Sequence, residues 1–194
     1  AYSLVTNNEA MRPSTQGQGG GIFVESTSRV TRIHASIIAG NRADRYPDCW
    51  TWVGTTIQSD DYNIIGASTQ DQNCVIDPQG STNDRIGSLT SPVTGFLSPM
   101  VNNPTVPAFY PLRNESSLIN AIPPAECLEY ETSLNHVSFA HARLLLKDQR
   151  GATRPQSRGG DIGPVEGSCG DGRPQPAEAC DDGNSVDNDR CTNA

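Results

Sequence analysis

GGGIFVESTSRVTRIHASIIAGN, residues 19–41, is the stretch that decides the fold. It opens on three glycines and contains a short apolar strand at 22–24, a polar turn at 25–28 and a β-branched strand at 30–39, which ends at a Gly-Asn corner. β-Branched residues favour strands, whereas Gly and Asn favour tight turns. Short strands joined by such turns are typical of one rung of a stacked β-solenoid. We therefore expect an all-β fold built from stacked rungs.

Residues 1–18 fit the end of a preceding rung, because a short strand over 2–6 runs into the corner Asn7-Asn8. The chain begins at Ala1 in the middle of this pattern, so we expect it to be a processed or excised piece of a longer precursor. Stacked repeats need a cover at each end. We accordingly expect a preceding solenoid segment, or another chain, at the N-terminal end.

Composition limits the function classes. The 194 residues carry a formal net charge of −8, with a pI near 4.7, which argues against nucleic-acid binding because phosphates need a basic face. No apolar run approaches the roughly 20 residues of a membrane helix. The 18 glycines and 14 prolines indicate many turns and few long helices.

Six cysteines are spread along the chain without a Cys-x-x-Cys motif. Spaced cysteines in an acidic, Lys-poor chain fit an oxidising compartment, so we expect a secreted protein or one on the outer cell surface. Cys49 and Cys74 bracket residues 50–73 and are expected to pair. Closing such a loop stabilises a fold by ~2–4 kcal/mol.

Trp50 and Trp52 are the aromatic binding candidates, because residues two apart on a strand share a face. One interpretation is a platform on which carbohydrate rings stack. The other is that one Trp packs over the disulfide and the other lies under a loop. We favour packing, since Trp dominates small cores.

The motifs in order resemble the C-terminal part of right-handed parallel β-helix proteins of bacterial surfaces, in particular the choice-of-anchor Q domains. The resemblance covers roughly residues 17–166 and rests on the opening stretch with Pro47-Asp48-Cys49, Tyr62–Gly66, Cys74, Asp84–Leu89, Tyr110-Pro111-Leu112, Ser116–Ala121, Asp148–Gly151, Arg154-Pro155, Gly160–Gly163 and Glu166. It implies the last rungs and the cap of a longer helix. Two departures are the insertion-like residues 123–142 and Gly160, where a Cys often stands, so that Cys127 lacks its expected partner.

The residues of this region also have a physical interpretation. Residues 75–113 lack periodicity and should form irregular loops. Residues 114–147 could form one or two short helical turns, and 137–146 could equally be a strand. Arg150 and Arg154 are expected to meet Asp148 and Asp161 in a buried polar clasp with a structural role.

A boundary falls near residues 165–168, giving a β-helix domain over 1–166 and a small appendage over 167–194. Cys169, Cys180 and Cys191 with the CDDGN motif resemble a myxobacterial-type cysteine-rich repeat of surface proteins. Cys127 either pairs with Cys169 or stays free. Five side chains of this appendage carry the hard oxygen atoms that Ca²⁺ prefers and are candidate calcium ligands: Asp181, Asp182, Asn184, Asp187 and Asp189. The alternative is that they are solvated turn residues, and no cofactor is required in either case.

Enzymatic activity is the less favoured expectation. The candidate catalytic groups are Asp44 and Asp48 with Arg42 and Arg45, and the adjacent pair Asp60 and Asp61. Adjacent residues would point to opposite faces of a strand. His34 is expected to be an exposed strand residue. We therefore expect a non-enzymatic structural or adhesive surface protein that binds a partner or matrix polysaccharide. The alternative is a polysaccharide lyase or glycoside hydrolase of the β-helix type.

Overall fold

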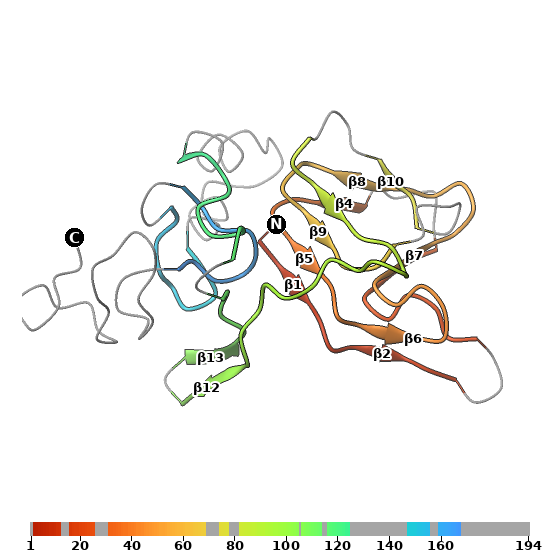
Figure 1. Cartoon of the computed structure of the whole chain (residues 1–194), viewed down its shortest axis with the longest axis horizontal. Coiled ribbons are helices and arrows are strands. Elements are labelled where there is room, and N and C mark those ends of the chain that lie inside the picture. Colours follow the sequence, from red (N-terminus) through yellow and green to blue (C-terminus); the bar gives the residue numbers. More distant parts are fainter. Residues whose placement is uncertain are drawn as a thin grey trace, which may run out of the picture. The chain divides into compact units, whose positions relative to one another are not determined.

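The structure is a computed structural model and describes residues 2–12, 16–25, 31–68, 74–77, 82–104, 106–113, 116–124, 147–155 and 159–167 (Figure 1). The chain divides into two compact units, residues 1–94 and 95–194. The elements of the described residues are all β-strands, which confirms the all-β class. The strands of the first unit are β1 (Leu4–Val5), β2 (Glu9–Ala10), β3 (Ile22–Val24), β4 (Thr31–Ile33), β5 (Ile37–Ile38), β6 (Arg42–Ala43), β7 (Cys49–Thr51), β8 (Ile57–Ser59), β9 (Ile64–Ile65), β10 (Ile76–Asp77) and β11 (Arg85–Ile86).

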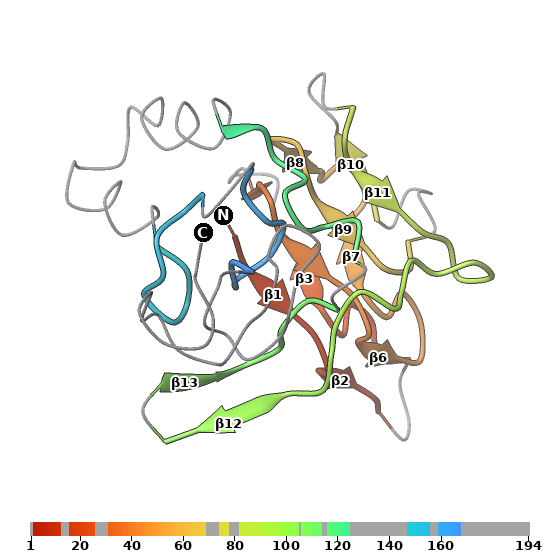
Figure 2. The same cartoon turned by 60° about the vertical axis from the view of Figure 1, so that its left-hand side comes forward.

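Every strand pair of the first unit is parallel, in the orders β1-β5-β9-β11, β10-β8-β4, β2-β6 and β3-β7. Figure 1 shows β1, β5 and β9 side by side, and Figure 2 shows β11 beside β9. Parallel neighbours require the chain to travel away and return in the same direction. We call the stretch from one strand to its parallel neighbour a pass. Paired residues lie 33 apart from Leu4 to Ile37, 27 from Ile37 to Ile64 and 21 from Ile64 to Arg85.

The strand expected over 30–39 is divided into β4 and β5, because Ala35 between them has a positive φ of 48°. Tyr2 before β1 and Tyr62 before β9 adopt the same left-handed conformation, with φ of 53° and 57°. These three residues occupy equivalent positions in successive passes. A non-glycine residue there costs roughly 1–2 kcal/mol, and cross-pass hydrogen bonds hold it: Tyr2 donates its N–H to the carbonyl of His34 at 3.0 Å.

A ladder of polar side chains runs across the same sheet, one residue before each strand. The N–H of Ser3 donates to Oγ of Ser36 (3.2 Å), the N–H of Ser36 to Oδ1 of Asn63 (3.0 Å), and the N–H of Asn63 to Oδ1 of Asp84 (2.8 Å). Each of these hydrogen bonds therefore joins a backbone donor in one pass to a side-chain acceptor in the next. We call these four residues the polar ladder; it fixes the register of the passes, because buried donors must be paired.

The core of the first unit lies between the strands and contains Val24, Ile33, Ile38, Cys49, Ile57, Ile65 and Cys74. Cys49 and Cys74 form a disulfide with their Cα atoms 5.6 Å apart, which confirms the predicted pairing. Both cysteines are fully buried. The disulfide thus joins β7 to the residues just before β10 inside the apolar core.

The second unit contains an antiparallel hairpin of β12 (Val101–Asn103) and β13 (Val106–Phe109). Leu118, Ile122, Ile162 and Val165 are buried, and the N–H of Ile162 donates to the carbonyl of Leu118 at 3.1 Å. The expectation of irregular loops over residues 75–113 was wrong where β10, β11 and this hairpin form. Most of residues 114–147, and all of residues 168–194, lie outside the described residues.

Candidate binding surface

Aromatic side chains gather where β3 and β7 pair. Residues alternate along β3, so that Phe23 and Glu25 are exposed while Val24 between them is buried. The parallel register places Phe23 directly opposite Trp50. Trp50 and Trp52 lie two apart on β7 and just beyond it. We call Phe23, Trp50 and Trp52 the aromatic surface.

The three rings are held in contact. Phe23 and Trp50 stack with centroids 4.5 Å apart and planes 17° from parallel, and Trp52 meets Trp50 edge-on at 5.5 Å and 77°. Trp50 is only 7% exposed, whereas Phe23 is 50% and Trp52 is 52% exposed. Stacked and edge-to-face contacts are each worth ~0.5–1.5 kcal/mol beyond burial. Trp50 therefore anchors two exposed rings whose planes differ.

Local backbone structure explains how these rings are positioned. The N–H of Trp52 donates to the carbonyl of Val24 at 2.8 Å, and the carbonyl of Trp52 accepts from the N–H (2.8 Å) and hydroxyl (2.7 Å) of Thr55. A side chain at Gly19 would place a Cβ 3.1 Å from that of Trp50 and 3.2 Å from that of Phe23. Gly19 also has a φ of +64°, so glycine is required beside the aromatic surface.

The structure brings the two predicted Trp candidates to one side, as their spacing indicated. The favoured packing interpretation placed one Trp over the disulfide and the other under a loop. Trp52 does not lie under a loop, because half of its surface is exposed. Phe23 was missed by sequence reasoning. Its place opposite Trp50 depends on the parallel register between strands 27 residues apart, Phe23 to Trp50.

Asp48, one of the carboxylates considered for catalysis, is buried at a corner of the first unit. Its Oδ1 accepts from the backbone and side-chain amides of Asn41, both at 2.9 Å, and its Oδ2 accepts from the N–H of Ala67 at 2.7 Å. Burial raises the pKa of Asp48, and these hydrogen bonds oppose the rise. Asp48 is 2% exposed, so it links passes rather than facing a ligand.

The other candidate carboxylates also bind the protein itself. Asp44 accepts from the N–H of Gly17 at 2.8 Å, and Asp60 forms an ion pair with Arg32 at 3.0 Å. Asp61 accepts from the N–H groups of Tyr62 (3.0 Å) and Asn83 (2.8 Å). These contacts indicate that the carboxylates of Asp44, Asp60 and Asp61 stabilise turns and loops of the first unit.

His34 is buried, which corrects the expectation of an exposed strand residue. Its exposure is 3%, and the rings of Tyr2 and Tyr62 meet it edge-on with centroids 5.5 and 6.4 Å away. Its Nδ1 lies 2.6 Å from the carbonyl of Asp60, and since a carbonyl only accepts, Nδ1 carries the proton. Burial lowers the pKa of His34, so the ring is neutral at physiological pH.

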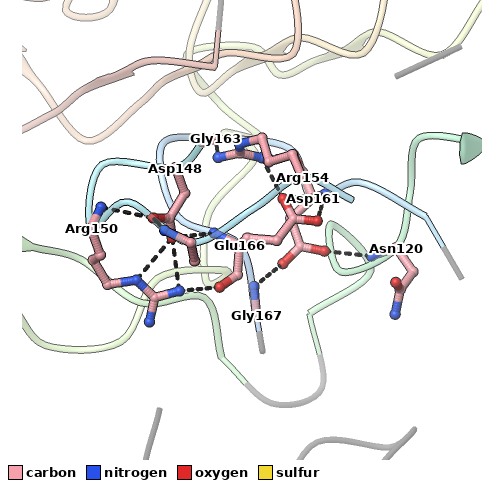
Figure 3. A network of polar contacts seen from close by, with 9 residues as sticks. Asn120, Asp148, Arg150, Arg154, Asp161, Gly163, Glu166 and Gly167 are labelled. Carbon is pink, nitrogen blue, oxygen red and sulfur yellow. Dashed lines mark hydrogen bonds and ion pairs between the residues drawn. The ribbon is translucent and has the colours of Figure 1, made fainter. Parts of the chain in front are cut away.

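In the second unit, Asp148, Arg150, Arg154, Asp161 and Glu166 form a polar cluster (Figure 3). Arg150 pairs with Asp148 at 2.8 Å and also contacts the carbonyl of Glu166. Arg154 pairs with Glu166 at 2.6 Å and donates to the backbone carbonyl of Asp161 at 3.0 Å. The predicted clasp is therefore present for Arg150, whereas the carboxylate partner of Arg154 is Glu166.

The carboxylate of Asp161 accepts hydrogen bonds from backbone N–H groups within this cluster. Its carboxylate accepts from the N–H of Asn120 at 2.7 Å and from the N–H of Gly167 at 2.6 Å (Figure 3). Burial raises its pKa to about 6, and the two hydrogen bonds together with Arg154 and Arg150 oppose the rise. Because Asp148, Arg154, Asp161 and Glu166 are all buried, the cluster joins segments of the second unit and presents no open carboxylate pair.

Within the described ranges, no group of three or more His, Cys, Asp or Glu side chains could hold a metal ion. The calcium candidates Asp181, Asp182, Asn184, Asp187 and Asp189 lie outside those ranges, as do Cys127, Cys169, Cys180 and Cys191. Calcium binding and the pairing of these cysteines stay predictions.

Comparison of the chain with protein-family models, with curated proteins and with solved structures found no significant match. In the part of the chain that the structure describes, no helix is long and apolar enough to cross a membrane.

Proposed function

We propose that this chain is the C-terminal part of a right-handed parallel β-helix that is secreted or displayed on the outer cell surface and binds matrix polysaccharide without catalysis. The parallel pairing of strands 33, 27 and 21 residues apart, from Leu4 through Ile37 and Ile64 to Arg85, supports a stacked architecture. The buried Cys49–Cys74 disulfide supports an oxidising compartment.

The observation that carries the binding proposal is the aromatic surface. The C–H groups on one face of a sugar ring are slightly positive, and the face of an aromatic ring is negative, so the two attract. Phe23 and Trp52 are each about half exposed, at 50% and 52%. The buried ring of Trp50 contacts both, by stacking on Phe23 and by an edge-on contact with Trp52. Rings immobilised in this way lose little side-chain entropy when a ligand binds.

The contacts of the candidate carboxylates support binding over turnover. Asp44, Asp48, Asp60 and Asp61 all accept hydrogen bonds or pair with Arg32 within the protein. A glycosidase instead needs two carboxyl groups roughly 5–10 Å apart across an accessible bond.

The same proposal includes a partner at the edge strand β1, either a preceding β-helix segment or another chain. In the described residues β1 is paired only with β5 and ends its sheet. The unpaired edge of such a strand is a template for a further parallel strand.

The test is retention of the full chain on insoluble polysaccharides, with and without the double substitution Phe23→Ala and Trp52→Ala. We expect the double variant to lose retention while a matched control, Leu89→Ala, keeps it; Leu89 is also exposed, at 53%, but lies outside the aromatic surface. Equal retention of both variants would refute the binding proposal. Release of new reducing ends or of ultraviolet-absorbing unsaturated products would instead establish the alternative, a hydrolase or lyase.

A further inference from the structure

We infer that the aromatic surface takes an uncharged oligosaccharide that spans at least two sugar rings, with Glu25 as a hydrogen-bond acceptor for its hydroxyl groups. This inference rests on the proposed function and specifies its ligand. It is carried by the orientation of the exposed rings and by the charge beside them.

The orientation of the exposed rings sets the minimum length of the ligand. Phe23 lies within 17° of the plane of Trp50, whereas Trp52 is turned 77° from it. The two exposed rings therefore face different directions, and one flat sugar ring can stack on only one of them. A ligand that uses both must present two rings joined by a flexible linkage.

A carboxylate lies close to the aromatic surface. Glu25 follows β3 on the same side as Phe23, and the hydrogen bond from Trp52 N–H to the carbonyl of Val24 (2.8 Å) continues the strand pairing to this point. An exposed carboxylate thus stands beside the exposed rings.

The charge of the whole chain has the same sign as this carboxylate. A formal net charge of −8 repels an acidic polymer as it approaches. A carboxylate accepts strong, charge-assisted hydrogen bonds from hydroxyl groups. Acidic polysaccharides are therefore disfavoured and neutral ones recognised.

The experiment applies the full chain to a glycan array of neutral and acidic oligosaccharides, followed by calorimetry with glucose, cellohexaose and hexagalacturonate. We expect neutral glycans to bind with little dependence on salt, and cellohexaose at least tenfold more tightly than glucose. Glu25→Gln should weaken cellohexaose roughly tenfold, because a charge-assisted hydrogen bond is replaced by a weaker one. Trp52→Ala or Phe23→Ala alone should remove the advantage of the longer ligand.

The outcomes separate the two proposals. If no glycan binds, the proposed function fails and this inference fails with it. Binding restricted to acidic glycans and weakened by salt overturns the inference and leaves the proposed function standing. Equal affinity for glucose and cellohexaose overturns the two-ring argument. The urea midpoint of each variant, compared with that of the unaltered chain, shows whether these exposed substitutions leave the fold intact.

Discussion

Replacement of Asp48 by Ala should destabilise the first unit more than any exposed substitution. The side chain accepts three hydrogen bonds, two from Asn41 and one from the N–H of Ala67. Ala leaves the two backbone N–H groups buried without this acceptor, at a cost of about 1–3 kcal/mol each. Removing a desolvated carboxylate offsets part of that loss. We expect a net loss of about 3 kcal/mol, a large fraction of the 5–15 kcal/mol typical of a domain.

Asp48→Asn separates the contributions of the two carboxylate oxygens, because an amide keeps one acceptor oxygen and loses the other. Its expected cost is about 1–3 kcal/mol, that of a single unpaired donor. Glu25→Gln is the matched control: this carboxylate is exposed and lies beyond the end of β3. Surface changes of this kind stay within about 0.5 kcal/mol.

Urea unfolding followed by tryptophan fluorescence measures all three variants. The chain has two tryptophans, of which Trp50 is buried at 7% exposure and reports on the first unit. An Asp48→Ala urea midpoint equal to that of Glu25→Gln, with an unchanged slope, would refute the assignment of Asp48 as the link between passes.

Three further predictions concern buried charge and the disulfide. Arg154→Met removes the ion pair of Glu166, whose side chain is 1% exposed, and should cost about 3–5 kcal/mol, whereas adding Glu166→Leu should recover much of the loss in thermal unfolding. Because burial raises the pKa of Asp161 from 3.8 to about 6, the folded state binds this proton more tightly. The free energy of unfolding should therefore fall by about 2 kcal/mol as pH rises from 4 to 7, and this slope should be absent in Asp161→Asn. Reduction of the Cys49–Cys74 bond, which spans 25 residues, should lower stability by about 2–4 kcal/mol in calorimetry with and without reductant.

Sequence reasoning succeeded where local chemistry decides structure. The β-branched residues around Ile22 and Ile37 form strands, and Gly40 adopts the left-handed corner expected of a Gly-Asn pair, with φ +74°. The disulfide followed from the positions of Cys49 and Cys74 around one loop. These features need no knowledge of which segments lie together.

Features that depend on register could not be predicted in the same way. The place of Phe23 over Trp50 follows from a parallel pair whose offset no local pattern reveals. The burial of His34 has the same origin, since two tyrosines from other passes enclose it. The carboxylate partner of Arg154 is Glu166, and Arg154 meets Asp161 at its backbone carbonyl, because side-chain pairing in a loop-rich unit depends on the fold of the whole segment.

The left-handed residues before β1, β5 and β9 have a consequence for how such a chain can lengthen. Tyr2, Ala35 and Tyr62 repeat one corner although their spacing changes from 33 to 27 residues. Each pass begins from the same backbone geometry whatever loop length follows. A whole pass is therefore a unit that gene duplication or protein engineering can insert or delete, provided that it supplies the corner, one polar ladder residue and two apolar strand residues.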